Sequence, residues 1–258
     1  MKTLLIDGNS LIHRAFYALP LLSTEDGTYT NAVYGFLKMF YRVADEYQPD
    51  HVVCAFDVKQ PTFRHERYAA YKAGRKKMPE ELAPQIPLLK EILTALGVRC
   101  AEAPGFEADD IIGTYSLLSD EEGGACVVLT GDRDALQLIS ENTTVWLTKK
   151  GITEVEKLTP EGLMDAYGLT PVQICDLKGL MGDSSDNIPG IAGVGEKTAL
   201  SLLEKYRCLE NVLAHAEEIP GKLGEKIRAG AEAAKESKFL ATIVRDVEVA
   251  PLRECVYT

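Results

Sequence analysis

The sequence lacks the long apolar runs, paired cysteines and basic excess that mark several classes of protein. No stretch approaches the roughly 18 apolar residues of a membrane-spanning helix, and Asp7 interrupts the N-terminal run, which disfavours a secretory signal peptide. There is no Gly-X-Y period, heptad repeat or low-complexity tract. These absences predict a globular protein of the cytoplasm with no membrane partner.

Cysteine and histidine are present in patterns that favour neither a disulfide scaffold nor a zinc site. The six cysteines form no CxxC pair, and three of them, Cys54, Cys100 and Cys126, lie in apolar runs typical of buried strands. The four histidines are far apart and match no zinc spacing. We therefore expect the cysteines to be small buried hydrophobic residues.

Basic charge is scarce overall but concentrated in one segment. The chain has 28 Lys and Arg against 39 Asp and Glu, a net charge of −11, which alone argues against a nucleic-acid partner. Residues 59–77 nevertheless contain seven cations and a single acid, Glu66. Arg64, Tyr71 and Arg75 form a rough stripe if the segment is helical, and cations alternating with aromatic rings suit single-stranded nucleic acid. A solvated basic surface helix is the alternative.

The order of apolar segments predicts an α/β fold followed by helices. Apolar, strand-like runs at residues 3–6, 52–56, 98–101, 126–130 and 144–147 alternate with helical patterns at 31–47, 84–96 and 109–118, as in a mostly parallel sheet. Beyond residue 158 only short helices are expected. The 258 residues therefore divide into a predicted α/β domain, 1–157, and a helical region, 158–258.

Acidic residues recur where the predicted strands end. Asp7, Asp57 and Asp132 each follow a strand-like run, and Asp134 lies two residues further on. Because the carboxyl ends of parallel strands share one edge of a sheet, neighbouring strands would bring these carboxylates together. Each one alone is more simply a helix N-cap.

Further acids lie near predicted helices. Glu107, Asp109 and Asp110 precede an apolar helical stripe, where capping is the plain interpretation, although Asp110 adjoins the buried face. Asp183 and Asp186 form a pair that also fits a solvated turn. Convergent carboxylates raise one another's pKa unless a cation holds them ionised, and a site of oxygen ligands alone suits Mg²⁺ or Mn²⁺.

A glycine-rich segment at residues 189–198 superficially matches a nucleotide-binding loop. The spacing is wrong for a Walker A sequence because Glu196 separates Gly195 from Lys197, and no strand precedes the segment. A glycine hairpin that opens a helix fits better. Its backbone amides and Lys197 are suited to contacting a phosphate, although a plain turn between helices is the alternative.

Taken together, these segments resemble the 5′-3′ exonuclease and flap endonuclease family, and in particular the N-terminal nuclease domain of bacterial DNA polymerase I. The likeness covers residues 3–250 and rests on Leu-Leu-Ile-Asp7-Gly-Asn, Ala-Phe-Asp57, Thr-Phe-Arg64-His-Glu-Arg-Tyr, Glu107-Ala-Asp109-Asp110, Thr-Gly-Asp132-Arg-Asp134 and Gly-Asp183-Ser-Ser-Asp186. The resemblance implies a PIN-like nuclease domain with a helical arch near residues 58–84. It also implies a helix–three-turn–helix DNA-binding region of the helix-hairpin-helix type.

The resemblance also implies roles for individual residues. The first of two Mg²⁺ or Mn²⁺ ions would be surrounded by Asp7, Asp57, Glu107, Asp109 and Asp110, and the second served by Asp132, Asp134, Asp183 and Asp186. Catalytic cations would be Lys72 and Arg75, with DNA contacts from Arg64, Tyr71, Lys178, Gly190, Gly193, Gly195 and Lys197. A K⁺ ion would be held by hairpin carbonyls around Ile191 and Val194.

The resemblance implies a monomeric enzyme that is a structure-specific 5′-3′ exonuclease and 5′-flap endonuclease. Its substrates would be DNA 5′ ends, flaps or nicks in replication and repair. A two-metal-ion hydrolysis would leave a 5′-phosphate and a 3′-hydroxyl. Three alternatives are a PIN-type ribonuclease, an aspartyl-phosphate phosphatase and a non-catalytic junction-binding protein. The phosphatase typically needs a second Asp where this chain has Asn9, and the binding protein gains nothing from clustered acids.

Overall fold

The computed structural model describes residues 1–149 and 151–257, which form two compact units. The first unit consists of Met1–Thr62, Lys77–Thr159 and Val244–Thr258, and the second of Phe63–Lys76 and Pro160–Ile243. The crossing from the first unit to the second after Thr159 lies close to the predicted boundary at residue 157. Two segments differ from that prediction: the basic segment 63–76 belongs to the helical unit, and the chain after residue 243 returns to the α/β unit.

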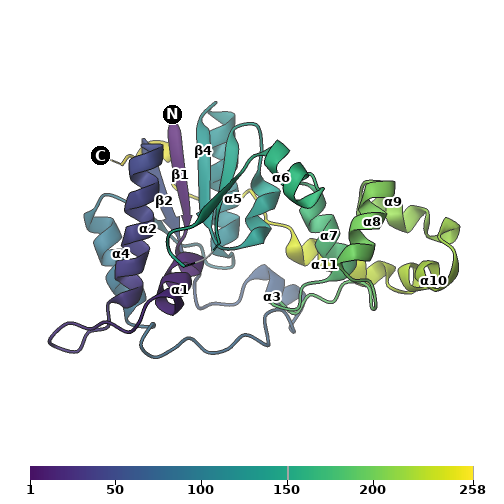
Figure 1. Cartoon of the computed structure of the whole chain (residues 1–258), viewed down its shortest axis with the longest axis horizontal. Helices are drawn as coiled ribbons and strands as arrows, with labels where there is room; N and C mark the ends of the chain where they lie inside the picture. Colours follow the sequence, from purple (N-terminus) through teal and green to yellow (C-terminus); the bar gives the residue numbers. More distant parts are fainter. Residues whose placement is uncertain (150, 258) are drawn as a thin grey trace. The chain divides into compact units, whose positions relative to one another are not determined.

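A six-stranded sheet is the centre of the first unit (Figure 1). The strand order is β3-β2-β1-β4-β5-β6, and every pair is parallel except β5 with β6. The strands are β1 (Lys2–Asp7), β2 (His51–Ala55), β3 (Arg99–Ala101), β4 (Ala125–Thr130), β5 (Thr143–Thr148) and β6 (Val155–Leu158). The mostly parallel sheet predicted from the sequence is therefore confirmed, and β6 is an added antiparallel edge strand.

Alternating side chains of these strands face two layers of helices. Leu4, Ile6 and their counterparts on β2 and β4 join the core formed with α1, α2 and α4, while α5 packs on the opposite face (Figure 1). Burial on both faces explains why the central strands are continuous apolar runs. The helices of this unit are α1 (Gly8–Ala18), α2 (Asn31–Tyr47), α4 (Gln85–Ala95) and α5 (Ala108–Glu121), with short 3₁₀ turns η1 (Arg133–Leu138) and η3 (Leu252–Glu254).

The second unit is built of helices alone, as expected. Its helices are α3 (Phe63–Arg67), α6 (Pro160–Tyr167), α7 (Gln173–Met181), α8 (Glu196–Tyr206), α9 (Leu209–Ala214), α10 (Gly221–Ala229) and α11 (Ala231–Ala241), with the 3₁₀ turn η2 (Ala216–Glu218). Gly230 separates α10 from α11. Among the described residues, no helix is long and apolar enough to cross a membrane.

The basic segment does not form the helix on which the predicted stripe of Arg64, Tyr71 and Arg75 depended. Helix α3 ends at Arg67, and Lys72 has a positive φ of 56° that interrupts helical geometry. The amide of Lys72 donates instead to the carbonyl of Asp186 at 2.9 Å. The cationic side chains of this segment are therefore arranged by contacts with the rest of the helical unit and not by helical periodicity.

Candidate functional site

Three of the predicted acids follow adjacent strands at one edge of the sheet. Strand β1 lies between β2 and β4, so Asp7, Asp57 and Asp132 occupy neighbouring positions at the carboxyl ends of those strands. The negative charges of Asp57 and Asp132 both act on the carboxyl group of Asp7 and raise its pKa. The sequence expectation that distant acids converge is confirmed for these three residues.

Asp7 is the most deeply buried of the three. Its side chain caps α1 by accepting from the amide of Ser10 at 2.9 Å, and its other oxygen accepts from Thr130 Oγ1 at 2.7 Å. Burial is the main cause that raises the pKa of Asp7 to about 7, and the charges of Asp57 and Asp132 add to it while the two hydrogen bonds oppose it. A buried carboxyl group facing two other acids is an environment that a cation would stabilise in its ionised form.

The other two acids are held by bonds to the backbone. Asp57 Oδ1 accepts from the amide of Ala108 at 2.8 Å, which ties the end of β2 to the start of α5. Asp132 Oδ1 accepts from the amide of Asp134 at 2.9 Å and so caps η1. The local capping interpretation is therefore correct for Asp7 and Asp132 but not for Asp57, which bonds an amide 51 residues away, and the convergence holds for all three.

Glu107, Asp109 and Asp110 open α5, and two of them cap it. Glu107 and Asp110 form a reciprocal capping box. Asp110 Oδ2 accepts from the amide of Glu107 at 3.0 Å, and Oδ1 accepts from the amide of Val244 at 3.0 Å. Since Asp110 is fully buried with both oxygens bonded to the backbone, its charge is accounted for by structural contacts, and its predicted metal-binding role stays a prediction.

Asp183 and Asp186 belong to the second unit, on the loop after α7. The amide and carbonyl of Asp183 pair with those of Ile188, which closes the loop around both acids. Burial alone would raise the pKa of Asp183, but hydrogen bonds from Lys178 and Ser185, together with the Lys178 charge, hold this pKa at about 2. Asp183 is therefore fully ionised near neutral pH.

Each of these two acids is paired with a predicted DNA-contacting or catalytic cation. Lys178 Nζ lies 2.6 Å from Asp183 Oδ2, and Arg75 Nη2 lies 2.6 Å from Asp186 Oδ1. Lys72 Nζ is 3.9 Å from the other oxygen of Asp186, towards which the Tyr71 hydroxyl donates at 3.5 Å. The helical unit thus gathers Tyr71, Lys72 and Arg75 around one carboxylate, although no helical stripe aligns them.

Arg64, which the resemblance assigned to DNA, is a buried side chain. It is 2% exposed, and its Nε and Nη2 donate to the carbonyls of Leu240 and Thr242 at 2.8 and 2.7 Å. These carbonyls lie at the C-terminal end of α11, where backbone acceptors lack helical partners. This geometry makes Arg64 an anchor between α3 and α11, and it leaves the guanidinium little surface for a phosphate.

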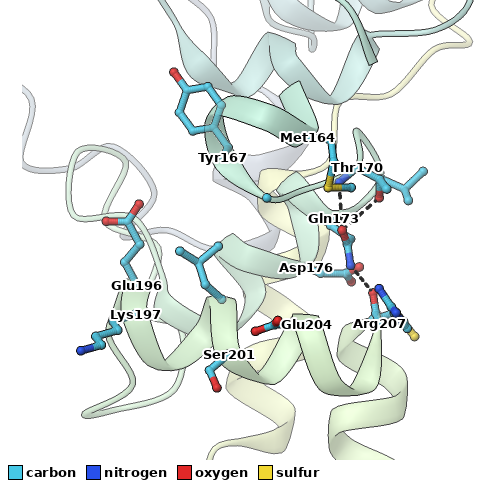
Figure 2. Close-up of a pocket in the computed structure, with 14 residues that line it drawn as sticks. Met164, Tyr167, Thr170, Gln173, Asp176, Glu196, Lys197, Ser201, Glu204 and Arg207 are labelled. Carbon is cyan, nitrogen blue, oxygen red and sulfur yellow. Dashed lines mark hydrogen bonds between the residues drawn. The ribbon is translucent and has the colours of Figure 1, made fainter. Parts of the chain in front are cut away.

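The glycine hairpin is confirmed as a turn that opens α8, with Gly195 as its N-cap. Gly190 has a φ of 61°, and a Cβ there would lie 2.2 Å from the amide nitrogen of Gly182, so its glycine is required by close backbone packing. Gly193 also has a positive φ, of 76°. Lys197 is exposed on the first turn of α8, and it is among the residues that line a hollow of about 1000 Å³ between α6, α7 and α8 (Figure 2).

Sequence reasoning missed the polar residues that position the acids. Thr130 Oγ1 donates to Asp7 and accepts from the amide of Asp132 at 2.9 Å, so one hydroxyl connects two acids. Asn9 Oδ1 accepts from the amide of Asp57 at 2.9 Å. Asn9 had been considered only as the residue that disfavours a phosphatase, and no pattern in the sequence indicates that it contacts the next strand.

The donor set of this edge fits hard divalent cations. The carboxylates are oxygen ligands, and no cysteine or histidine is among the predicted ligands, a combination that favours Mg²⁺ or Mn²⁺ over Zn²⁺. Burial, with smaller contributions from the charges of Asp57 and Asp132, raises the pKa of Asp7, and a divalent ion at this edge would favour its ionised form.

Comparisons with known proteins agree with this architecture. The chain matches the 5′-3′ exonuclease N-terminal resolvase-like domain over residues 2–168 and the 5′-3′ exonuclease C-terminal SAM fold over residues 169–257. It is 53% identical over 249 residues to DNA polymerase I of Geobacillus stearothermophilus and 49% identical to that of Bacillus subtilis. Each alignment covers 96% of this chain but 28% of the relative, so the chain spans less than a third of these proteins.

Solved structures show the same fold at low sequence identity. The T5 D15 protein co-crystallised with metal ions has a TM-score of 0.75 at 19% identity, with 93% of this chain and 89% of that chain covered. The catalytic core of Rad2 in complex with DNA substrate has a TM-score of 0.61 at 17% identity, with 100% and 82% covered. The two matched domains together span nearly the whole chain, which therefore belongs to the 5′-3′ exonuclease family of nucleases.

Proposed function

We propose that this chain is a structure-specific 5′-3′ exonuclease and 5′-flap endonuclease that hydrolyses DNA phosphodiesters to a 5′-phosphate and a 3′-hydroxyl. The observation that carries the proposal is the convergence of Asp7, Asp57 and Asp132 at adjacent strand ends in a chain of this family. The T5 and Rad2 structures, described with metal ions and with DNA substrate, support it. Bacterial DNA polymerase I relatives support a setting in replication and repair in the cytoplasm.

In this proposal the acids of the α/β unit hold two divalent ions, with Asp183 and Asp186 contributing to the second. When bound, such ions neutralise the phosphate and assist water in an in-line displacement. Asp7, Asp57 and Asp132 would hold the ions, because backbone and hydroxyl donors fix the orientation of their carboxylates. Glu107, Asp109, Asp110 and Asp134 are assigned to the same ions through direct or water contacts.

The cations around Asp186 are assigned to the reacting phosphate. Lys72 and Arg75 lie on the segment that the resemblance identifies as the arch base, and a fixed positive charge there would stabilise negative charge that develops during hydrolysis. Tyr71 supports them through its contact with Asp186. For Arg64 we propose an indirect role, since its buried guanidinium holds α3 against α11.

We assign duplex DNA binding to the helical unit. Lys178, Lys197 and the hairpin glycines would contact the phosphate backbone of the DNA. A K⁺ ion on the hairpin carbonyls is part of the same proposal, and its test is a comparison of DNA affinity in KCl and NaCl at equal ionic strength. Weaker binding in NaCl is the expected result, and equal affinities in the two salts would remove K⁺ from the proposal.

The central test is a 5′-flap cleavage assay with matched DNA and RNA flaps in Mg²⁺ and in EDTA. We expect cleavage of the DNA flap in Mg²⁺ and not in EDTA, with a 3′-hydroxyl on the released flap and a 5′-phosphate on the strand that remains in the duplex. Preferential cutting of the RNA flap would favour a PIN-type ribonuclease. Tight flap binding without cleavage of either flap in Mg²⁺ would favour a junction-binding protein.

A second test concerns Lys197. A plot of log affinity against log salt concentration has a negative slope. Replacing Lys197 with Met should make this slope less steep by about one, the value expected from the loss of one phosphate contact. The matched control is Lys205→Met, which removes a lysine from the last turn of the same helix. Equal slopes for Lys197→Met and the wild-type protein would make Lys197 an ordinary surface residue.

A further inference from the structure

The tip of the glycine hairpin is held by a lysine that the sequence did not single out. Lys226, on α10, donates from Nζ to the carbonyl of Gly193 at 3.2 Å. A Cβ built on Gly193 would lie 2.6 Å from this Nζ and 3.2 Å from Cε, so the lysine passes through the space that any other side chain at position 193 would need. A larger residue at this position would displace the flexible end of Lys226 from the carbonyl, while the positive φ of Gly193 itself favours glycine.

The base of the hairpin is fixed in a different way. Ile191 and Val194 are buried, the amide of Gly190 donates to Ser237 Oγ at 2.9 Å, and the amide of Ile191 donates to the carbonyl of Leu180 at 2.8 Å. The two hydrogen bonds hold the first side of the turn against α7 and α11. They do not set the orientation of the peptide planes at its exposed tip.

The peptide between Gly193 and Val194 is fixed at both of its polar ends. Its carbonyl accepts from Lys226, and its amide, that of Val194, donates to the carbonyl of Ile191 at 3.0 Å. The amides of Gly193 and Gly195 lie on the two neighbouring peptides, and within the described chain neither donates a hydrogen bond. The orientation of the central peptide therefore constrains how these two amides present themselves to solvent.

We propose that Lys226 is a positioning residue for DNA binding, which holds the Gly193–Val194 peptide so that the Gly193 and Gly195 amides can together meet a phosphate oxygen. Two amides flanking one fixed peptide form a small anion-binding concavity. This inference rests on the proposed DNA-binding function of the hairpin. In this arrangement Lys226 contacts the carbonyl of Gly193, while the amides of Gly193 and Gly195 and the side chain of Lys197 contact the phosphate.

The test compares Lys226→Met with Lys226→Arg and with Lys222→Met, an exposed lysine one turn earlier on α10. Dissociation constants for a nicked, flapped duplex are measured in EDTA over a series of salt concentrations. We expect Lys226→Met to weaken binding about fivefold, the size of one exposed hydrogen bond, without changing the salt slope. Lys226→Arg should restore most of the affinity, and Lys222→Met should retain it.

A second readout does not depend on DNA. Amide hydrogen exchange at Val194, followed by NMR, should accelerate in Lys226→Met and not in Lys222→Met, while the thermal melting curves of both variants match that of the wild-type protein. Unchanged exchange at Val194 or unchanged DNA affinity in Lys226→Met would overturn the proposal. A salt slope that is less steep by about one in Lys226→Met would also overturn the proposal, because Lys226 would then contact a phosphate directly.

The same experiment separates this inference from the function on which it rests. If Lys197→Met keeps the wild-type salt slope and neither Lys197→Met nor Lys226→Met alters affinity, the hairpin does not bind DNA, and the proposed function of the helical unit fails. If Lys197→Met behaves as expected while Lys226→Met matches the wild-type protein, only the positioning role of Lys226 fails.

Discussion

Replacing Asp132 with Asn should abolish flap cleavage while DNA binding is retained. Asn keeps an oxygen that can accept from the amide of Asp134, so the cap of η1 survives, but the negative charge facing Asp7 is lost. We expect the cleavage rate in Mg²⁺ to fall by at least about a thousandfold, since metal-assisted charge stabilisation contributes several kcal/mol to such reactions. Single-turnover cleavage of a 5′-flap substrate measures the loss.

Asp45→Asn is the matched control for this experiment. Asp45 is an exposed acid on α2, so its replacement changes the net charge by the same amount without altering the strand-end acids. Cleavage by Asp45→Asn should equal that of the wild-type protein, and both variants should bind the flap with wild-type affinity in EDTA. Cleavage by Asp132→Asn at the wild-type rate would falsify the assignment of this edge as the metal site.

The second large effect is on stability, and it concerns Asp7. The pKa of its carboxyl group is about 7 in the folded chain against 3.8 for an ordinary Asp, chiefly because the group is buried. Between these two values the folded state keeps a proton that the unfolded state releases, so the metal-free protein should lose stability as pH rises from about 4 to 7. At about 1.4 kcal/mol per pKa unit, the total loss is on the order of a few kcal/mol.

Asp7→Asn should remove this pH dependence, because the amide does not ionise. Urea unfolding in EDTA at pH 8 should therefore show the variant to be more stable than the wild-type protein, while the two approach each other near pH 4. Mg²⁺ should stabilise the wild-type protein at pH 8 and have little effect on the variant, since an ion that binds the folded state alone stabilises it. Parallel pH profiles for the two proteins in EDTA would contradict the raised pKa.

The sequence was sufficient to predict that acidic residues gather at one edge of the sheet, because this prediction needs only two features. Buried strands read as apolar runs, and parallel strands place their carboxyl ends together, so Asp7, Asp57 and Asp132 were expected at one edge. Which strands are neighbours could not be derived from the pattern. The order that places β1 between β2 and β4 depends on how the crossover helices pack, and this is a property of the whole core.

The basic segment shows where sequence periodicity fails. Cations and rings at helical spacing suggested a stripe, but the guanidinium of Arg64 binds carbonyls 176 and 178 residues away, and Arg75 binds Asp186, 111 residues away. Such partners have no local signature, because long-range contacts outweigh the modest helical propensity of a short polar segment. The contact between Lys226 and Gly193 was missed for the same reason.

The return of the chain to the α/β unit after residue 243 has a consequence for the order of events during synthesis. The amide of Val244 bonds Asp110, that of Val247 bonds Thr114 Oγ1, and Val256 bridges to His51 beside the sheet. A nascent chain that has emerged only as far as the helical unit has all of its strands but still lacks these partners for α5 and β2. The α/β unit is therefore completed only after the helical unit that interrupts it has left the ribosome.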